Sequence, residues 1–210
     1  MGQNFKKTYL IGNSGHGHVL VDTASINGIS VEGYFQAQKN HENPFLLSYL
    51  GHESDCDDSF FASSKFLIGI GNNQKRSEVY NFIKSKKGMI QTLIHPSTFI
   101  SKLSSIQEGC FVNTQAIIHV SATIGVNSII NTSAIIEHDC QIGAHSHIAP
   151  GAILCGNVNI GEYSLIGAGA IVRQGINIGS NVTVGAGSVV IKDIPDDKTV
   201  IGNPSRYVDL

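Results

Sequence analysis

The feature that most constrains this fold is an aliphatic residue at every sixth position through the C-terminal half of the chain. The residue four places after each of them is small or aliphatic and never charged. Glycine directly follows the aliphatic residue at six of these places. The aliphatic positions are Ile94, Ile100, Ile106, Val112, Ile118, Ile124, Ile130, Ile136, Ile142, Ile148, Leu154, Ile160, Ile166, Val172, Ile178, Val184 and Val190.

A repeat of this period predicts a parallel β-helix built from hexapeptides. Each hexad supplies one short strand and one turn, and three hexads close one triangular coil of about 18 residues. The aliphatic side chain points inward, and the small residue fits the crowded corner. Successive coils stack like parallel strands, about 4.8 Å apart, so each coil buries its surface only against its neighbours.

Residues 1–93 lack the repeat and predict a separate, small parallel α/β domain. Strands are expected at 8–12, 29–35, 66–71 and 89–94, with helices after 12–18 and over 72–88. Strands that alternate with helices indicate a parallel sheet. Residues 36–64 are polar and irregular, and they favour loops. The sequence therefore predicts two domains, 1–93 and 94–210.

A glycine-rich turn, "GNSGHGH" at 12–18, joins the first expected strand to the first expected helix. Such a turn lets backbone N–H groups and a helix N-terminus face a phosphate. The spacing is GxxGxG rather than the GxGxxG of dinucleotide-binding folds. Two interpretations stay open, a nucleotide-binding loop and a tight structural turn, and His16 would either bind a substrate or cap the helix.

Composition excludes several classes of partner. The net charge is −2 with 14 Lys and Arg residues and no basic run, which disfavours nucleic acid and anionic membranes. No apolar run is long enough for a membrane span, and the first residues lack a signal peptide. The four cysteines form no CxxC pair, so free thiols in a reducing cytoplasm are expected.

Three histidines, His138, His145 and His147, fall within ten residues of one another. They occupy different positions of their hexads, so they would lie on different faces or edges of the β-helix, and a metal site is not expected. His145 is expected to decorate the exterior. Cys140 falls in an inward, small-residue position and is expected to be core. Acid–base chemistry by His138 fits best, because an imidazole titrates near neutrality and an adjacent carboxylate favours its charged form.

Four features together resemble the sugar acyltransferases of the PglD/NeuD type: the "GNSGHGH" turn, "IGNNQKR" at 70–76, the hexapeptide array and "VIGNPSRYV" near the C-terminus. The resemblance implies a Rossmann-like nucleotide-sugar domain followed by a left-handed parallel β-helix. It also implies acetyl-CoA as co-substrate, no metal, and a homotrimer with active sites at the subunit interfaces.

The resemblance also assigns residues. The segment "NTSAIIEHDC" at 131–140 matches the family's catalytic motif, which makes His138 the general base. Asp139 is its acidic partner, with Glu137 as the other candidate, and Asn131 belongs to the active site. His147 matches a residue at the thioester end of acetyl-CoA. The other matches are Gly156, Ala168 and Ala186 along the pantetheine arm, and Ser14, Gly15, His16, Gly71 and Asn72 in the nucleotide-sugar loops.

Coil arithmetic adds an expectation for Gly156 that does not depend on the family. A residue 18 positions further on lies directly above in the next coil, so Gly156 stacks on His138. A glycine there leaves room for the thioester, and its N–H would stabilise the oxyanion that develops.

One departure from the family concerns the nucleotide site. Gln36 and Ala37 stand where the family carries two acidic residues after the second strand. Any contact that those acids make with a nucleobase or a ribose is therefore in question for this chain.

The expected activity is direct N-acetylation of the 4-amino group of a nucleotide-activated 4-amino-4,6-dideoxy sugar. No acyl-enzyme is expected, because no Ser or Cys sits beside a base in a nucleophile motif. Two alternatives remain. One is an O-acetyltransferase that acts on sialic acid or a related sugar, and the other is a non-catalytic hexapeptide scaffold.

Overall fold

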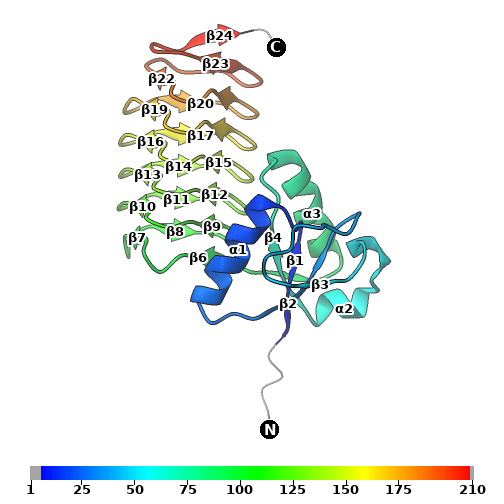
Figure 1. Cartoon of the computed structure of the whole chain (residues 1–210). Helices are drawn as coiled ribbons and strands as arrows, with labels where there is room; N and C mark the ends of the chain where they lie inside the picture. Colours follow the sequence, from blue (N-terminus) through cyan, green and yellow to red (C-terminus); the bar gives the residue numbers. More distant parts are fainter. Residues whose placement is uncertain (1–5, 209–210) are drawn as a thin grey trace. The chain divides into compact units, whose positions relative to one another are not determined.

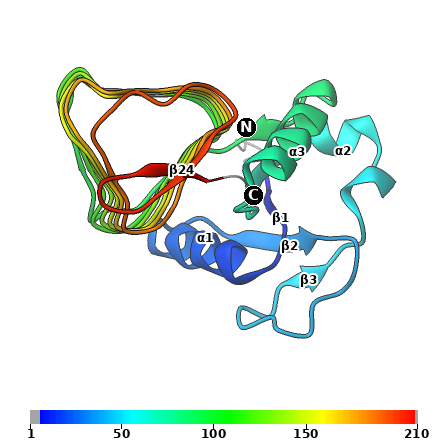
Figure 2. The ribbon, with the colours of Figure 1, turned by 90° about the horizontal axis from the view of Figure 1, so that it is seen from above.

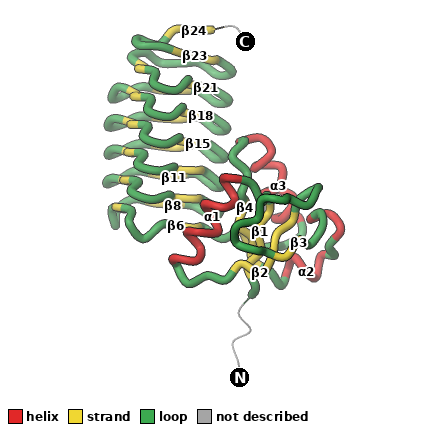
Figure 3. Tube along the Cα trace, in the orientation of Figure 1, coloured by secondary structure: helices red, strands yellow, loops and turns green. Residues whose placement is uncertain are grey.

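A computed structural model describes residues 6–208, and the chain forms two compact units that divide between Leu93 and Ile94. Figure 1 follows the chain through both units. All helices of the described chain lie in the N-terminal unit, and the second unit consists of short strands and turns (Figure 3).

The N-terminal unit holds a parallel sheet of five strands in the order β3-β2-β1-β4-β5. Three short elements lie within residues 36–64, so the expectation of loops there was wrong for them; they are β3, η1 and α2. The strands are β1 (Thr8–Ile11), β2 (Val31–Phe35), β3 (Ser48–Tyr49), β4 (Lys65–Ile68) and β5 (Met89–Ile90), and the helices are α1 (Gly15–Ile26), η1 (Glu53–Asp55), α2 (Asp58–Ala62) and α3 (Asn73–Ser85).

The strand order changes direction at β1, because β2 pairs with one of its sides and β4 with the other. In open parallel sheets, ligands bind outside the carboxyl ends of the strands at such a switch point. Glycine is required there, since a Cβ on Gly17 or Gly69 would overlap the Gly12 carbonyl oxygen. The glycine-rich turn therefore lets α1 start close against the ends of β1 and β4.

The second unit is a triangular parallel β-helix with three sheets, which Figure 2 shows from above. We call face 1 the six-stranded sheet β22-β19-β16-β13-β10-β7, face 2 the five-stranded sheet β20-β17-β14-β11-β8, and face 3 the eight-stranded sheet that runs from β24 to β6. Ile117 pairs with Ile135, and Ile135 with Ile153. These steps of 18 residues confirm that three hexads close one coil.

The strands of the β-helix are two residues long until the C-terminal end, where β23 and β24 pair antiparallel over the last coil. They are β6 (Leu93–Ile94), β7 (Phe99–Ile100), β8 (Ser105–Ile106), β9 (Phe111–Val112), β10 (Ile117–Ile118), β11 (Thr123–Ile124), β12 (Ile129–Ile130), β13 (Ile135–Ile136), β14 (Gln141–Ile142), β15 (His147–Ile148), β16 (Ile153–Leu154), β17 (Asn159–Ile160), β18 (Leu165–Ile166), β19 (Ile171–Val172), β20 (Asn177–Ile178), β21 (Thr183–Val184), β22 (Val189–Val190), β23 (Thr199–Ile201) and β24 (Arg206–Val208).

The predicted inward positions form the core of the β-helix. From Val112 to Val190 the repeating aliphatic residues are between 0% and 4% exposed. Ile94, Ile100 and Ile106 in the first coil are only partly buried, because no coil lies below them. Burial of each aliphatic side chain contributes roughly 1.5–3 kcal/mol, and the stacked coils leave the turns at the three edges free to carry function.

Candidate active site

His138 lies on the turn that follows β13, at the edge between faces 1 and 2. Its Nδ1 is 2.8 Å from Oδ2 of Asp139, and both side chains are 57% exposed. Asp139 has a φ of 61°, the left-handed conformation that recurs at this turn position around the β-helix. Asp139, whose carboxylate contacts the His138 imidazole, thus adopts the backbone conformation of this turn position. The conformation of the turn therefore helps to hold Asp139 beside His138.

Gly156 lies one coil above His138, as the coil arithmetic predicts. A Cβ at this position would come within 2.5 Å of Cε1 and Nε2 of the imidazole. Within residues 6–208 the N–H of Gly156 has no hydrogen-bond partner. In this orientation of the His138 ring, only a glycine fits at position 156. The unpaired N–H of Gly156 is then a backbone donor beside the predicted base. We call the turns that carry His138 and Gly156 the histidine edge.

Glu137 contacts a different histidine. Its Oε1 is 3.9 Å from Nε2 of His119, one coil below, and both side chains are more than a third exposed. Such an exposed pair contributes little to stability. The structure thus places the Asp139 carboxylate on His138 and the Glu137 carboxylate on His119.

Asn131 and His147 meet at another part of the β-helix, where face 3 turns into face 1. Nδ2 of Asn131 is 3.1 Å from Nε2 of His147. Oδ1 of Asn131 accepts hydrogen bonds from Nδ2 of Asn113 at 3.0 Å and from the backbone N–H of Thr132 at 2.8 Å. The Asn131 amide nitrogen must then donate, so Nε2 of His147 accepts and the ring proton of neutral His147 sits on Nδ1.

Ala168 and Ala186 continue this second edge upward, one coil apart, and both are exposed. Each is followed by a glycine with a φ of 67°. No side chain longer than a methyl group projects from these two turns, so an extended ligand can lie against their backbone. We call the turns with Asn131, Ala168 and Ala186 the small-residue edge.

The structure therefore divides the predicted β-helix residues into two groups. His138, Asp139 and Gly156 share the histidine edge, whereas Asn131, His147, Ala168 and Ala186 lie along the small-residue edge or beside it. Face 1 separates the two groups within one chain.

His145 does not decorate the exterior, and that expectation was wrong. It is 6% exposed, its Nδ1 is 2.9 Å from Nδ2 of Asn127, and its ring stacks on Tyr163 with centroids 5.1 Å apart. Asn127, His145 and Tyr163 hold the same left-handed turn position in successive coils. Their side chains therefore stack along the remaining edge, where His145 has a structural role.

Cys140 is fully buried in the β-helix core, as predicted, and its thiol donates to the carbonyl of Cys155 at 3.2 Å. Burial raises the pKa of the Cys140 thiol to about 11. A thiol with this pKa stays protonated at neutral pH and is a poor nucleophile.

Replacing Cys140 by alanine is therefore expected to leave the rate of acetyl transfer near that of the wild type. Ala122 fills the same inward position one coil below without exposure, so the fold accepts alanine, at a cost of about 1 kcal/mol. Steady-state kinetics on the folded variant measure this. Complete loss of activity with an intact circular dichroism spectrum would restore a covalent route through the thiol.

The N-terminal unit carries a cavity of about 560 Å³ at the carboxyl ends of β1, β2 and β4. Of the predicted nucleotide-sugar residues, Ser14 and Gly71 line it, and so do Gln36 and Ala37 at the departure from the family pattern. Gly15, His16 and Asn72 do not line it. The Asn72 side chain instead caps α3 by accepting the Lys75 N–H at 3.0 Å.

Arg76 is a residue of this site that the sequence interpretation missed. It is 1% exposed, and its guanidinium donates to the carbonyls of Ile70 and Gly71 at 3.3 and 3.0 Å and to Oδ1 of Asn73 at 2.8 Å. These bonds fix the loop between β4 and α3, so Arg76 positions a wall of the cavity. The signal was its place at the end of "IGNNQKR".

His16 lies in the first turn of α1, where Ser14 rather than His16 is the N-cap. Burial, and to a lesser extent the positive charge of Arg76, together lower the pKa of His16 to about 4. The imidazole is therefore neutral at physiological pH and contributes no charge to the glycine-rich turn.

This pKa predicts a loss of stability in acid. Between pH 6.5 and 4 the unfolded chain protonates His16 and the folded chain does not, so the free energy of unfolding falls as pH falls through this range. The loss reaches about 3 kcal/mol near pH 4. Urea unfolding of the wild type and of His16→Gln at several pH values measures this loss. If the free energy of unfolding depended on pH equally in the two proteins, the lowered pKa of His16 would be contradicted.

Residues 6–208 contain no group of three or more His, Cys, Asp or Glu side chains placed to hold a metal ion. In the same residues, no helix combines the length and the apolar character needed to cross a bilayer.

Comparison with protein families gives matches to both units. Residues 7–83 match the PglD N-terminal domain. Residues 133–161 match the hexapeptide repeat of succinyl-transferase, and residues 157–192 match the bacterial transferase hexapeptide. The predicted fold, a parallel α/β domain followed by a left-handed hexapeptide β-helix, is confirmed by these matches and by the sheets described above.

Solved structures extend the likeness over nearly the whole chain. The acetyltransferase domain of PglB from Neisseria gonorrhoeae is 33% identical, with a TM-score of 0.89 over 97% of this chain and 100% of that one. A second structure of that domain contains acetyl coenzyme A. A variant of perosamine N-acetyltransferase from Caulobacter crescentus, solved with CoA and GDP-perosamine, is 29% identical, with a TM-score of 0.92 over 98% of each chain.

The likeness thus covers the N-terminal domain, the hexapeptide array and the order in which they follow each other. The segments that carried the resemblance form two loops that contribute to the cavity lining, the β-helix, and its closing strands β23 and β24. The chain belongs to the PglD-type sugar acetyltransferases, as the sequence predicted.

Proposed function

We propose that this acetyltransferase uses acetyl-CoA to N-acetylate the 4-amino group of a nucleotide-activated 4-amino-4,6-dideoxy sugar, for surface polysaccharide or glycan assembly. The observation that carries the proposal is the His138–Asp139 pair beside Gly156, in a chain of this family. The similar structures add support through the ligands that they contain, acetyl coenzyme A in one and CoA with GDP-perosamine in the other.

In the proposed reaction His138 is the general base. Asp139 accepts the Nδ1–H, so the lone pair on Nε2 of His138, on the ring edge beside Gly156, is available to receive a proton. The nitrogen of the sugar amine attacks the thioester carbonyl carbon and forms the C–N bond, while His138 takes a proton from that nitrogen. The C–S bond then breaks, and the thiolate of CoA leaves with the proton that His138 releases. A general base of this kind contributes about 10²- to 10⁴-fold in rate.

The carbonyl oxygen gains negative charge during the attack. The free N–H of Gly156 lies next to the imidazole, and we assign it to this oxygen. Loss of one well-aimed donor costs about 2.7–4 kcal/mol in a known oxyanion hole. On the small-residue edge, Asn131 and His147 would hold the thioester end of acetyl-CoA, with the pantetheine arm along Ala168 and Ala186.

The two edges are proposed to meet between subunits of a homotrimer. The outward positions of face 1 are all apolar, and Phe99 and Ile171 are 56% and 39% exposed. Face 2 carries polar residues at the equivalent positions, among them Gln141, Asn159 and Asn177. The outward residues of face 1 are Phe99, Ile117, Ile135, Ile153, Ile171 and Val189.

An apolar ladder of this length favours contact with another chain. Face 1 is bordered by the histidine edge on one side and by the small-residue edge on the other. A closed ring of subunits that packs through this face therefore brings the histidine edge of one chain to the small-residue edge of the next.

The proposed location is cytoplasmic, because the four cysteines are free thiols, which a reducing compartment preserves.

Thiol release from acetyl-CoA tests the proposed reaction. The acceptors are GDP-, UDP- and dTDP-linked 4-amino-4,6-dideoxy sugars and free sialic acid, with mass spectrometry of the products. We expect CoA release with a nucleotide-linked amine and a product heavier by one acetyl group on nitrogen. O-acetylated sialic acid would identify the alternative enzyme, and no release with any acceptor would favour a non-catalytic scaffold.

A further inference from the structure

The cavity of the N-terminal unit lies at the carboxyl ends of β1, β2 and β4, and the start of η1, which follows β3, also lines it. In open parallel sheets, a nucleotide places its phosphates at the first strand and helix, and its ribose at the end of the next strand. The base then lies further out, toward the third strand. In this chain the three places belong to the glycine-rich turn, to Gln36, and to His52 with Glu53. All three line the same cavity.

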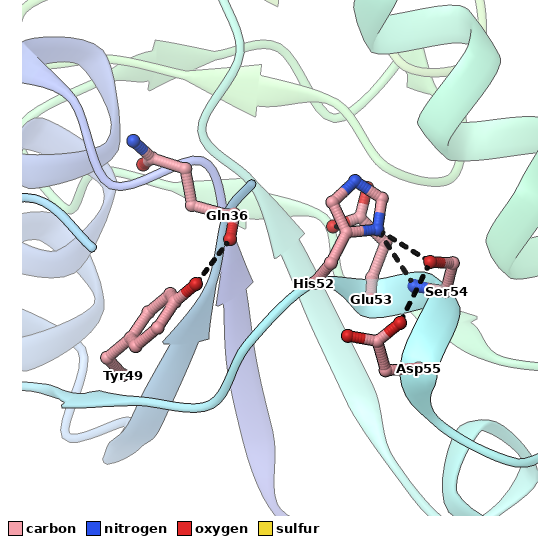
Figure 4. A network of polar contacts seen from close by, with 6 residues as sticks. All are labelled: Gln36, Tyr49, His52, Glu53, Ser54 and Asp55. Atoms are coloured by element: carbon pink, nitrogen blue, oxygen red, sulfur yellow. Dashed lines mark hydrogen bonds and ion pairs between the residues drawn. The ribbon is translucent and has the colours of Figure 1, made fainter. Parts of the chain in front are cut away.

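Gln36, directly after β2, is held at several points, of which Figure 4 shows the contact with Tyr49. Its Oε1 accepts the backbone N–H of Asn13 at 2.8 Å, and its own N–H donates to the carbonyl of Gly51 at 2.9 Å. The hydroxyl of Tyr49 donates to the Gln36 carbonyl at 3.2 Å. The side-chain oxygen is thus already engaged, and the ribose site has no carboxylate from this strand.

His52 is fixed in one tautomer by its neighbour. The backbone N–H of Ser54 donates to Nδ1 of His52 at 3.2 Å, and the Ser54 hydroxyl lies 2.8 Å from the same nitrogen (Figure 4). A nitrogen that accepts a backbone N–H carries no proton, so the neutral ring bears its proton on Nε2. His52 therefore offers a hydrogen-bond donor on the side of the ring away from Ser54.

Glu53 is the carboxylate of this group. Its side chain is only 13% exposed, and Nδ1 of His52 approaches its Oε2 at 3.8 Å. This approach is not an ion pair, because the same Nδ1 accepts the Ser54 N–H and has no proton to share. No Lys or Arg of residues 6–208 pairs with Glu53. Glu53 thus adds a shielded carboxylate with unused acceptor oxygens to the cavity lining. It lies beside His52, which supplies a fixed donor (Figure 4).

We propose that Glu53 recognises a guanine base in the nucleotide-sugar substrate. This inference rests on the proposed function and identifies the base of the nucleotide. Guanine carries two adjacent donors, N1–H and the N2 amino group, beside the O6 acceptor. A carboxylate accepts both donors at once, and the Nε2–H of His52 suits O6. Uracil and thymine present a single N–H between two carbonyls, and adenine and cytosine place an acceptor beside one amino group. Uracil or thymine could give its N3–H to one carboxylate oxygen and accept from His52, but its second carbonyl would then face the other carboxylate oxygen. Guanine alone among these bases supplies a donor to each carboxylate oxygen and an acceptor to His52.

Calorimetric titration of the full chain with nucleoside diphosphates tests this without acetyl transfer. GDP is expected to bind about 10- to 100-fold more tightly than UDP, dTDP or IDP, since IDP lacks the N2 amino group and leaves an acceptor of Glu53 unpaired. Glu53→Gln should lose most of the preference for GDP over IDP and leave UDP affinity unchanged. The same variant should gain affinity for XDP, whose C2 carbonyl accepts from the new amide. Asp55→Asn, an equal change of charge on the exposed side of η1, is the control and should keep the preference for GDP.

Equal affinities for the diphosphates, no binding, or an equal loss for all of them in Glu53→Gln would overturn the assignment. An equal loss would place the carboxylate on the ribose diol that all of them share. These results would leave the proposed acetyl transfer standing, because thiol release measures it separately. Conversely, a preference for GDP that depends on Glu53, without acetylation of any sugar amine, would support the guanine site and remove the proposed reaction.

Discussion

Replacing His138 by alanine is expected to lower kcat by about 10²- to 10⁴-fold, which is the usual contribution of a general base. The free energy of unfolding should change by less than about 0.5 kcal/mol, because exposed side chains away from the core contribute little. His138 is 57% exposed, and the hydrogen bond that its side chain makes within residues 6–208 goes to Asp139. The variant therefore separates chemistry from folding.

Steady-state kinetics of the wild type and of His138→Ala provide the measurement, and the loss should appear in kcat. Asp139→Asn should lower kcat less, since the ring then loses the carboxylate that orients it. His95→Ala is a suitable control, because His95 lies on the same β-helix more than two coils away. Turnover of His138→Ala within a few-fold of the wild type would reject the base.

Two inactive variants are expected to restore each other's activity when their chains assemble together. His138→Ala disables the histidine edge, and Ala168→Trp fills the small-residue edge with an indole. Both positions are exposed, so both chains should fold. In a trimer that contains both chains, one of the three interfaces pairs an intact histidine edge with an intact small-residue edge. About one third of the wild-type activity should therefore return in such mixed trimers.

Co-expression with two affinity tags, followed by purification through both, yields the mixed assemblies for this assay. Mixing the two purified variants without exchange of chains is the control and should remain inactive. If each active site were built from one chain, the mixed assembly would also be inactive, because every chain carries one disabled edge. Such a result would remove the proposed trimeric site while leaving the family assignment intact.

The β-helix could be predicted from sequence because its constraint is local and repeated. Each coil demands the same inward residue, so the register that begins at Ile94 predicts both the core and the position of Gly156 over His138. His145 shows where this reasoning ends. Periodicity predicts the turn position, but burial there depends on Asn127 and Tyr163 in the neighbouring coils. The repeat alone does not predict that the side chains of Asn127, His145 and Tyr163 contact one another.

The cavity of the N-terminal unit was predicted less completely for a similar reason. The glycine-rich turn could be recognised, because a close approach of backbone to backbone requires glycine. Arg76 could not be recognised, because it acts through hydrogen bonds to carbonyls of the loop before α3. Glu53 could not be recognised either, because it lies in a segment that was expected to be a loop. The absence of acidic residues at Gln36 and Ala37 was visible, but the nearby carboxylate depends on the short elements that follow β2.

A single-turnover experiment with radiolabelled acetyl-CoA and a nucleotide-linked amino sugar tests the central claim most directly. If His138 promotes direct attack by the amine, the label should move from CoA to the sugar nitrogen in one phase. One CoA should be released per acetamide, no label should remain on the protein, and the transfer should be lost in His138→Ala. Label covalently bound to the protein before the product forms, or transfer at the wild-type rate without His138, would contradict the account.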